Sequence, residues 1–96
     1  MMYKYSLKLY LSGKTPQSRK ALENLTAICE SVLPGKYEIE QVDILKAPEV
    51  AEQDKVVATP SVVRFKPEPT RMVIGDLSDR IEVVNGLDII SDEESQ

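Results

Sequence analysis

The sequence has no histidine and no tryptophan, and its 96 residues include one cysteine and one phenylalanine. Without histidine, His-based acid–base catalysis, Cys-His and Ser-His pairs and most metal sites are excluded. The single cysteine, Cys29, cannot form an internal disulfide bond, which predicts a reducing, cytoplasmic location. No run of about 18 or more apolar residues is present, so no membrane-spanning helix is expected.

The charge balance is acidic, with 16 Asp and Glu residues against 12 Lys and Arg residues and a net charge of −4. Nucleic-acid binders need clustered Lys and Arg side chains to displace counterions from phosphates, so nucleic acid is disfavoured as a partner. The four glycines are scattered and do not form a phosphate-binding loop. We therefore expect no cofactor.

The spacing of apolar residues predicts one domain at residues 1–90, followed by an acidic tail at residues 91–96. Alternating apolar residues predict strands, and apolar residues three and four positions apart predict amphipathic helices. The predicted elements are a strand within residues 1–13, a helix from Thr15 or Ser18 to Val32, a strand at Tyr37–Leu45, a short helix at Pro48–Lys55, strands at Ser61–Phe65 and Arg71–Ile74, and a helix at Asp79–Ile90. This βαβαββα order is typical of a thioredoxin-like α/β fold, in which a mixed sheet carries helices on both faces.

Thioredoxin-type chemistry requires a Cys-x-x-Cys motif at the start of the first long helix, where the helix N-terminus lowers the thiol pKa. Here that place holds Thr15-Pro16-Gln17-Ser18, whose hydroxyl groups cannot form a disulfide. Cys29 falls on the apolar face of the helix and is expected to be a packed core side chain. Pro60 is the candidate for the cis-proline that thioredoxin-like folds carry beside this place; the alternative is a trans proline that opens an edge strand. We therefore predict no disulfide exchange and no enzymatic activity.

A small basic group stands out in this acidic sequence. It consists of Lys55, Arg64, Lys66 and Arg71. Such groups are usually solvated, but they can also form a docking surface.

The last predicted helix combines opposing signals. Four apolar residues recur at helical spacing, which predicts a buried face. They are Ile81, Val84, Leu87 and Ile90. Yet residues 82–90 are rich in β-branched side chains that favour strands, and Gly86 costs about 1 kcal/mol relative to Ala inside a helix. Such opposition is expected where two packings differ by a few kcal/mol, although helices held by tertiary contacts alone are common.

Several short motifs follow one another along the chain. They are Leu7-Lys8-Leu9-Tyr10, Gly13-Lys14-Thr15-Pro16-Gln17-Ser18, Val42-Asp43-Ile44-Leu45-Lys46, Ala51-Glu52-Gln53-Asp54-Lys55, Ala58-Thr59-Pro60, Ile74-Gly75-Asp76-Leu77-Ser78-Asp79-Arg80 and Gly86-Leu87-Asp88. The run at residues 74–80 is more specific than any single turn motif. Over residues 5–90 this set closely resembles the KaiB family of small circadian-clock proteins.

The resemblance implies a non-enzymatic regulator that binds the N-terminal ATPase ring of a KaiC-like hexameric ATPase and kinase and modulates its phosphorylation cycle or signalling output. In the bound state such a protein sequesters a KaiA-like protein and displaces a sensor histidine kinase. KaiB proteins also switch fold, from a thioredoxin-like monomer to a tetramer of order βαββααβ with a rearranged C-terminal half. Self-association to a dimer or tetramer is therefore expected. The alternative, from another class, is a stand-alone thioredoxin-like stress-adaptation protein or holdase without redox activity.

By the same resemblance, Tyr5, Gly86 and Asp88 tune the switch between folds, and Lys55 and Arg71 contact partners. The substitution Gly86→Ala or Asp88→Arg is then expected to shift the balance toward the thioredoxin-like monomer. Which of the two folds dominates at rest is left open by the sequence.

Overall fold

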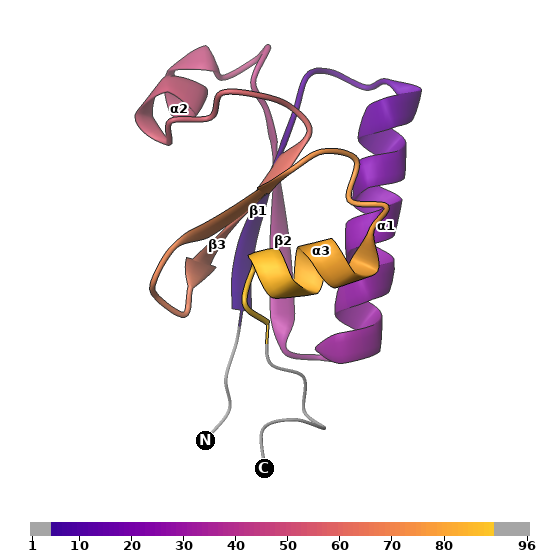
Figure 1. Ribbon diagram of the computed structural model, residues 1–96. Coiled ribbons are helices and arrows are strands. Elements are labelled where there is room, and N and C mark those ends of the chain that lie inside the picture. Colours follow the sequence, from indigo (N-terminus) through magenta and orange to yellow (C-terminus); the bar gives the residue numbers. More distant parts are fainter. Residues whose placement is uncertain (1–4, 90–96) are drawn as a thin grey trace.

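The computed structural model describes residues 5–89, and it confirms the predicted thioredoxin-like architecture (Figure 1). Ile90 and the acidic tail predicted at residues 91–96 lie outside the described residues. The elements are β1 (Tyr5–Leu11), α1 (Pro16–Val32), β2 (Tyr37–Asp43), α2 (Pro48–Gln53), β3 (Ser61–Lys66), β4 (Arg71–Ile74) and α3 (Arg80–Gly86). None of these helices is both long enough and apolar enough to span a membrane.

The four strands form one sheet in the order β2-β1-β3-β4. Strand β1 pairs in parallel with β2, because helix α1 carries the chain back between them, and pairs antiparallel with β3. Strand β4 pairs antiparallel with β3 through a short turn. Within residues 5–89, β2 and β4 are therefore the two edges of the sheet, and β1 lies in its interior.

The larger core lies on the face of the sheet that α1 and α3 cover (Figure 1). Its sixteen buried residues are Tyr5, Leu7, Leu9, Leu11, Ala21, Leu25, Ile28, Cys29, Val32, Leu33, Val62, Val73, Leu77, Val83, Leu87 and Ile89. The alternation predicted for β1 is thus confirmed. The larger core joins segments from both halves of the chain.

A smaller core lies on the opposite face, where α2 packs (Figure 1). Its buried residues are Tyr10, Val42 and Val63, with Val50, Val56 and Phe65 packed against them. Tyr10 points to the face opposite Leu9 and Leu11, and it is fully buried because an interior strand is covered on both sides. Its phenol remains satisfied, since the hydroxyl donates a hydrogen bond of 2.5 Å to Asp54.

Three predicted elements end earlier than expected; one of them is α2, which ends at Gln53 and not at Lys55. Strand β2 stops at Asp43, and Leu45 is 70% exposed, because the Asp43 carboxylate accepts hydrogen bonds from the backbone N–H groups of Leu45 and Gly13. Helix α3 stops at Gly86, and its predicted apolar face is confirmed only in part: Leu87 is fully buried and Val84 packs against the larger core. Ile81, expected inside, is 73% exposed, whereas Val83 is fully buried.

Candidate functional site

Hydroxyl groups occupy the place where a thioredoxin-like fold would hold its redox site. The Thr15 hydroxyl caps α1, since Thr15 Oγ1 accepts a hydrogen bond of 3.0 Å from the backbone N–H of Ser18. The Ser12 and Thr59 hydroxyls lie 2.7 Å apart, and the peptide bond that follows Thr59, to the buried Pro60, is cis. Because these hydroxyl groups have no imidazole base to activate them, the arrangement supplies no nucleophile for thiol-type chemistry.

The only thiol of the sequence lies away from this place, inside the larger core. Cys29 is fully buried, and burial, with a further contribution from Glu30, raises the pKa of the thiol to about 12. Since the thiolate is the reactive species, this side chain is inert at neutral pH. Among residues 5–89, no group of three or more His, Cys, Asp and Glu side chains is placed to hold a metal ion.

Lys55, a predicted partner-contact residue, is exposed and follows Asp54, the C-cap of α2. Its φ angle is +58°, in the left-handed region. The Lys55 N–H donates to the Glu52 carbonyl and the Val56 N–H donates to the Ala51 carbonyl. This pair of hydrogen bonds is a Schellman motif, which ends the helix and turns the lysine side chain onto the surface.

Asp88, a predicted switch residue, ends α3 in the same way. Its φ angle is +52°, its N–H donates to the Asn85 carbonyl, and the Ile89 N–H donates to the Val84 carbonyl. Ile89 and Val84 both pack in the larger core, as the hydrophobic contact of a Schellman motif requires. The helix therefore cannot continue to Ile90 as predicted.

Gly86 and Tyr5, the other predicted switch residues, both border this C-terminal segment. A Cβ atom on Gly86 would lie 2.4 Å from Cγ2 of Val73, so the missing side chain lets α3 approach β4 closely. Tyr5 is buried in the core cluster that also contains Leu87 and Ile89, and its N–H donates to the carbonyl of Lys36. The structure thus gathers the predicted switch residues in and around one core.

The predicted basic group is divided by burial: Lys55, Lys66 and Arg71 are exposed, and Arg64 is buried. Arg71 is exposed on β4, near the hairpin turn, whereas Lys55 follows α2 beside the other end of β3 (Figure 1). Arg64 was expected to be solvated, but it is only 3% exposed. The cause is its position on the α1 and α3 side of β3, where its guanidinium donates to the carbonyls of Pro69 and Asp88.

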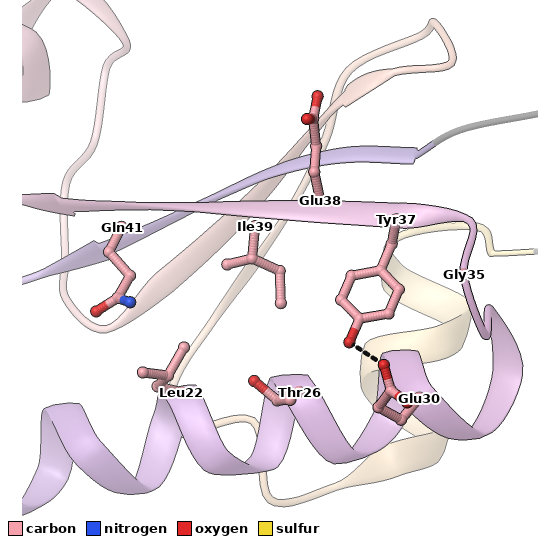
Figure 2. Close-up of a pocket in the computed structure, with 8 residues that line it drawn as sticks. All are labelled: Leu22, Thr26, Glu30, Gly35, Tyr37, Glu38, Ile39 and Gln41. Atoms are coloured by element: carbon pink, nitrogen blue, oxygen red, sulfur yellow. Dashed lines mark hydrogen bonds between the residues drawn. The ribbon is translucent and has the colours of Figure 1, made fainter.

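A groove between α1 and the edge strand β2 was not anticipated from the sequence. It has a volume of about 600 Å³, and Tyr37, Ile39 and Gln41 point from β2 toward α1 (Figure 2). The Tyr37 hydroxyl donates to the Glu30 carboxylate, and this hydrogen bond raises the pKa of Tyr37 to about 12. The alternation of β2 was the available signal, but it could not show that α1 would leave this side of the edge strand open.

Comparisons with known proteins give one family and one fold. The chain matches the sequence profile of the KaiB domain over residues 8–89. A protein of Prochlorococcus marinus strain NATL2A, named circadian clock oscillator protein KaiB, is 50% identical over 89 residues, which make up 93% of this chain and 83% of that protein. A protein of the same name from Gloeothece citriformis strain PCC 7424 is 48% identical over 89 residues, covering 93% of this chain and 84% of that protein.

Two solved structures with similar backbones are far more distant in sequence. The N-terminal domain of Synechococcus elongatus SasA superposes with a TM-score of 0.75 at 20% identity, covering 92% of this chain and 87% of that one. Mitochondrial thioredoxin 3 of Saccharomyces cerevisiae superposes with a TM-score of 0.69 at 15% identity, covering 90% of this chain and 78% of that one. At such identities the likeness shows the thioredoxin-like fold alone.

Proposed function

Because the chain belongs to the KaiB family, we propose that it is a circadian-clock regulator that acts by binding other proteins and not by catalysis. The observation that carries this proposal is the match of residues 8–89 to the KaiB domain, together with about half identity to proteins named circadian clock oscillator protein KaiB. The hydroxyl groups at the redox place and the inert Cys29 support a binding role, since neither supplies a thiolate.

The proposed main partner is a KaiC-like hexameric ATPase and kinase, whose phosphorylation cycle or output the chain modulates. A KaiA-like protein or a sensor histidine kinase is the proposed second partner. Lys55 and Arg71 are the proposed contact residues, because both are exposed and positively charged on an acidic chain. Their separation across the sheet favours a broad contact surface over a single pocket.

We test this proposal by calorimetric titration of the chain into a cognate KaiC-like hexamer, in each nucleotide state and with phosphomimetic variants of the hexamer. Lys55→Asn and Arg71→Gln are expected to weaken binding by about tenfold each, since each removes a charge from the contact. Lys55→Asn keeps a residue that tolerates the left-handed backbone at this position. The control is Lys46→Gln, which removes an exposed lysine outside the proposed contact. Absence of binding in every state of the hexamer would sink the proposal.

A change of fold is the second part of the proposal. We propose that the thioredoxin-like monomer exchanges with a tetramer of element order βαββααβ, in which the C-terminal half of the chain is repacked. One feature supports this part: the left-handed backbone of Asp88, the residue after the C-cap of α3, places local strain at the end of this helix. Analytical ultracentrifugation over a concentration series, with NMR secondary-structure assignment of residues 45–89, tests it. A single monomeric species with the described elements at all concentrations would count against a switch.

A further inference from the structure

Arg64 is a buried cation that lacks an ion-pair partner among the described residues. Its side chain is 3% exposed, and among residues 5–89 no acidic side chain forms an ion pair with it. Moving a guanidinium out of water is unfavourable unless its N–H groups are satisfied within the protein. The partners of these groups therefore decide what Arg64 does.

The guanidinium joins two segments through their main-chain carbonyl groups. Nη2 donates to the carbonyl of Pro69 at 2.6 Å, in the turn between β3 and β4. Nη1 donates to the carbonyl of Asp88 at 3.0 Å, at the end of α3. The Nε–H group is also buried, and none of the residues 5–89 offers it a hydrogen-bond partner, so the ligation of the charge is incomplete.

The bond to Asp88 falls on the residue that ends α3 in the left-handed region. An aspartate adopts this conformation less readily than glycine, so the helix end depends on outside support. Arg64 gives that support only while the turn is also in place, because the same guanidinium holds both carbonyls. Loss of either bond would leave a buried charge with one ligand.

We propose that Arg64 is a positioning residue that couples the β3–β4 turn to the end of α3, so that these two segments open together. The proposal concerns the described fold and does not depend on clock function or on a second fold. The contact of α1 with the loop between β4 and α3, in which Asn24 Nδ2 donates to the Asp76 carbonyl at 2.9 Å, lies outside this coupling.

Hydrogen exchange of backbone amides, measured by NMR on the full chain, tests the coupling. In Arg64→Met, the amides of Asp88 and Ile89 and those of β4 are expected to exchange at least about tenfold faster, while α1 stays as protected as in the native chain. Arg64→Lys keeps the charge with a single donor group and is expected to give a smaller increase at both segments. This variant also provides the measurement if the Met variant does not fold.

Two further variants separate coupling from general loosening. In Arg64→Met with Asp88→Gly, the glycine relieves the left-handed backbone, so the α3 end is expected to recover protection while β4 does not. Asn24→Ala removes the α1 contact and is expected to leave exchange at β4 unchanged. Faster exchange of Arg64→Met at only one of the two segments, or equally fast exchange throughout α1, would overturn the proposal.

Discussion

Lys55 and Asp88 occupy the same structural position, the first residue beyond the C-cap of a helix, with φ angles of +58° and +52°. Each is followed by a valine or isoleucine whose N–H returns to the last turn of its helix. Glycine is the usual residue at this position because a Cβ atom costs about 1–2 kcal/mol in the left-handed region. Both helices therefore carry a charged side chain where the backbone alone would favour glycine. This is expected if Lys55 contacts a partner and Asp88 tunes the switch between folds, as predicted.

Replacement of Lys55 by glycine is expected to separate stability from binding. Lys55→Gly should raise the free energy of unfolding by up to about 1 kcal/mol, because the left-handed strain disappears. The same variant should bind a KaiC-like hexamer more weakly, because the charge is gone. Urea denaturation and calorimetric titration measure the two effects. Lys55→Ala is the control, since it removes the charge and keeps the strain; equal stability of the Gly and Ala variants would contradict the argument.

Replacement of Asp88 by glycine is expected to stabilise the described fold for the same backbone reason, again by about 1 kcal/mol. The Asp88 carbonyl, which accepts from Arg64, is retained in the variant. If the chain exchanges between two folds, the monomeric thioredoxin-like population should grow, as sedimentation velocity would show. Asp88→Val is the opposing variant, because a β-branched residue tolerates the left-handed region poorly. A lower denaturation midpoint for Asp88→Gly than for the native chain would refute this prediction.

Gly86 and Val73 are expected to be energetically coupled. Alanine at Gly86 gains about 1 kcal/mol in helix propensity, but its Cβ would lie 2.4 Å from Val73 Cγ2, and a buried valine has little rotamer freedom to move aside. The contact therefore opposes the stabilisation that the sequence predicted for Gly86→Ala. In a Val73→Ala background the collision is absent, so Gly86→Ala should be more favourable there by about 1 kcal/mol or more. A double-mutant cycle by urea denaturation measures this difference. Additive effects of the two substitutions would show that the Cβ atom added at Gly86 does not collide with Val73.

The thiol of Cys29 is expected to be unreactive. It is also expected to make the free energy of unfolding fall as the pH becomes alkaline. Because burial raises the pKa of this thiol to about 12 in the folded chain, the folded state keeps a proton that the unfolded state releases above its ordinary pKa, about 8.5. The contribution to stability is therefore complete below that ordinary value and is lost as pH rises toward 12. Near pH 8, reaction with a disulfide reagent should be about a hundredfold slower in the native chain than in urea. Cys29→Ala should flatten the alkaline fall in stability; an equally steep fall would assign it to other groups.

The order of elements could be predicted because each local signal agreed with its surroundings. The alternation of β1 and the cap at Thr15 are both local features of the sequence. The lack of a Cys-x-x-Cys motif also follows from residue identity alone. These features needed no knowledge of which segments meet in space.

The errors came from long-range contacts and from a backbone conformation that sequence patterns describe poorly. Arg64 was expected in solvent because its two acceptor carbonyls become neighbours only after folding. The end of α3 was missed because a left-handed Asp88 gives no pattern signal, whereas a glycine there would have. The groove beside β2 depends on how α1 lies over an edge strand, which periodicity does not encode (Figure 2).

The distribution of the larger core between the two halves of the chain has a kinetic consequence. Ten of its sixteen buried residues lie between Tyr5 and Leu33, and six lie between Val62 and Ile89. The unit formed by β1, α1 and β2 can therefore collapse on its own apolar surface before the distant C-terminal segments are recruited. Truncation of Leu25 should chiefly slow refolding, and truncation of Leu87 should chiefly accelerate unfolding, in stopped-flow chevron plots. The C-terminal segments would then pack onto the N-terminal unit and detach from it while that unit stays folded. The lifetime of the C-terminal packing is therefore set by the barrier to its own unfolding.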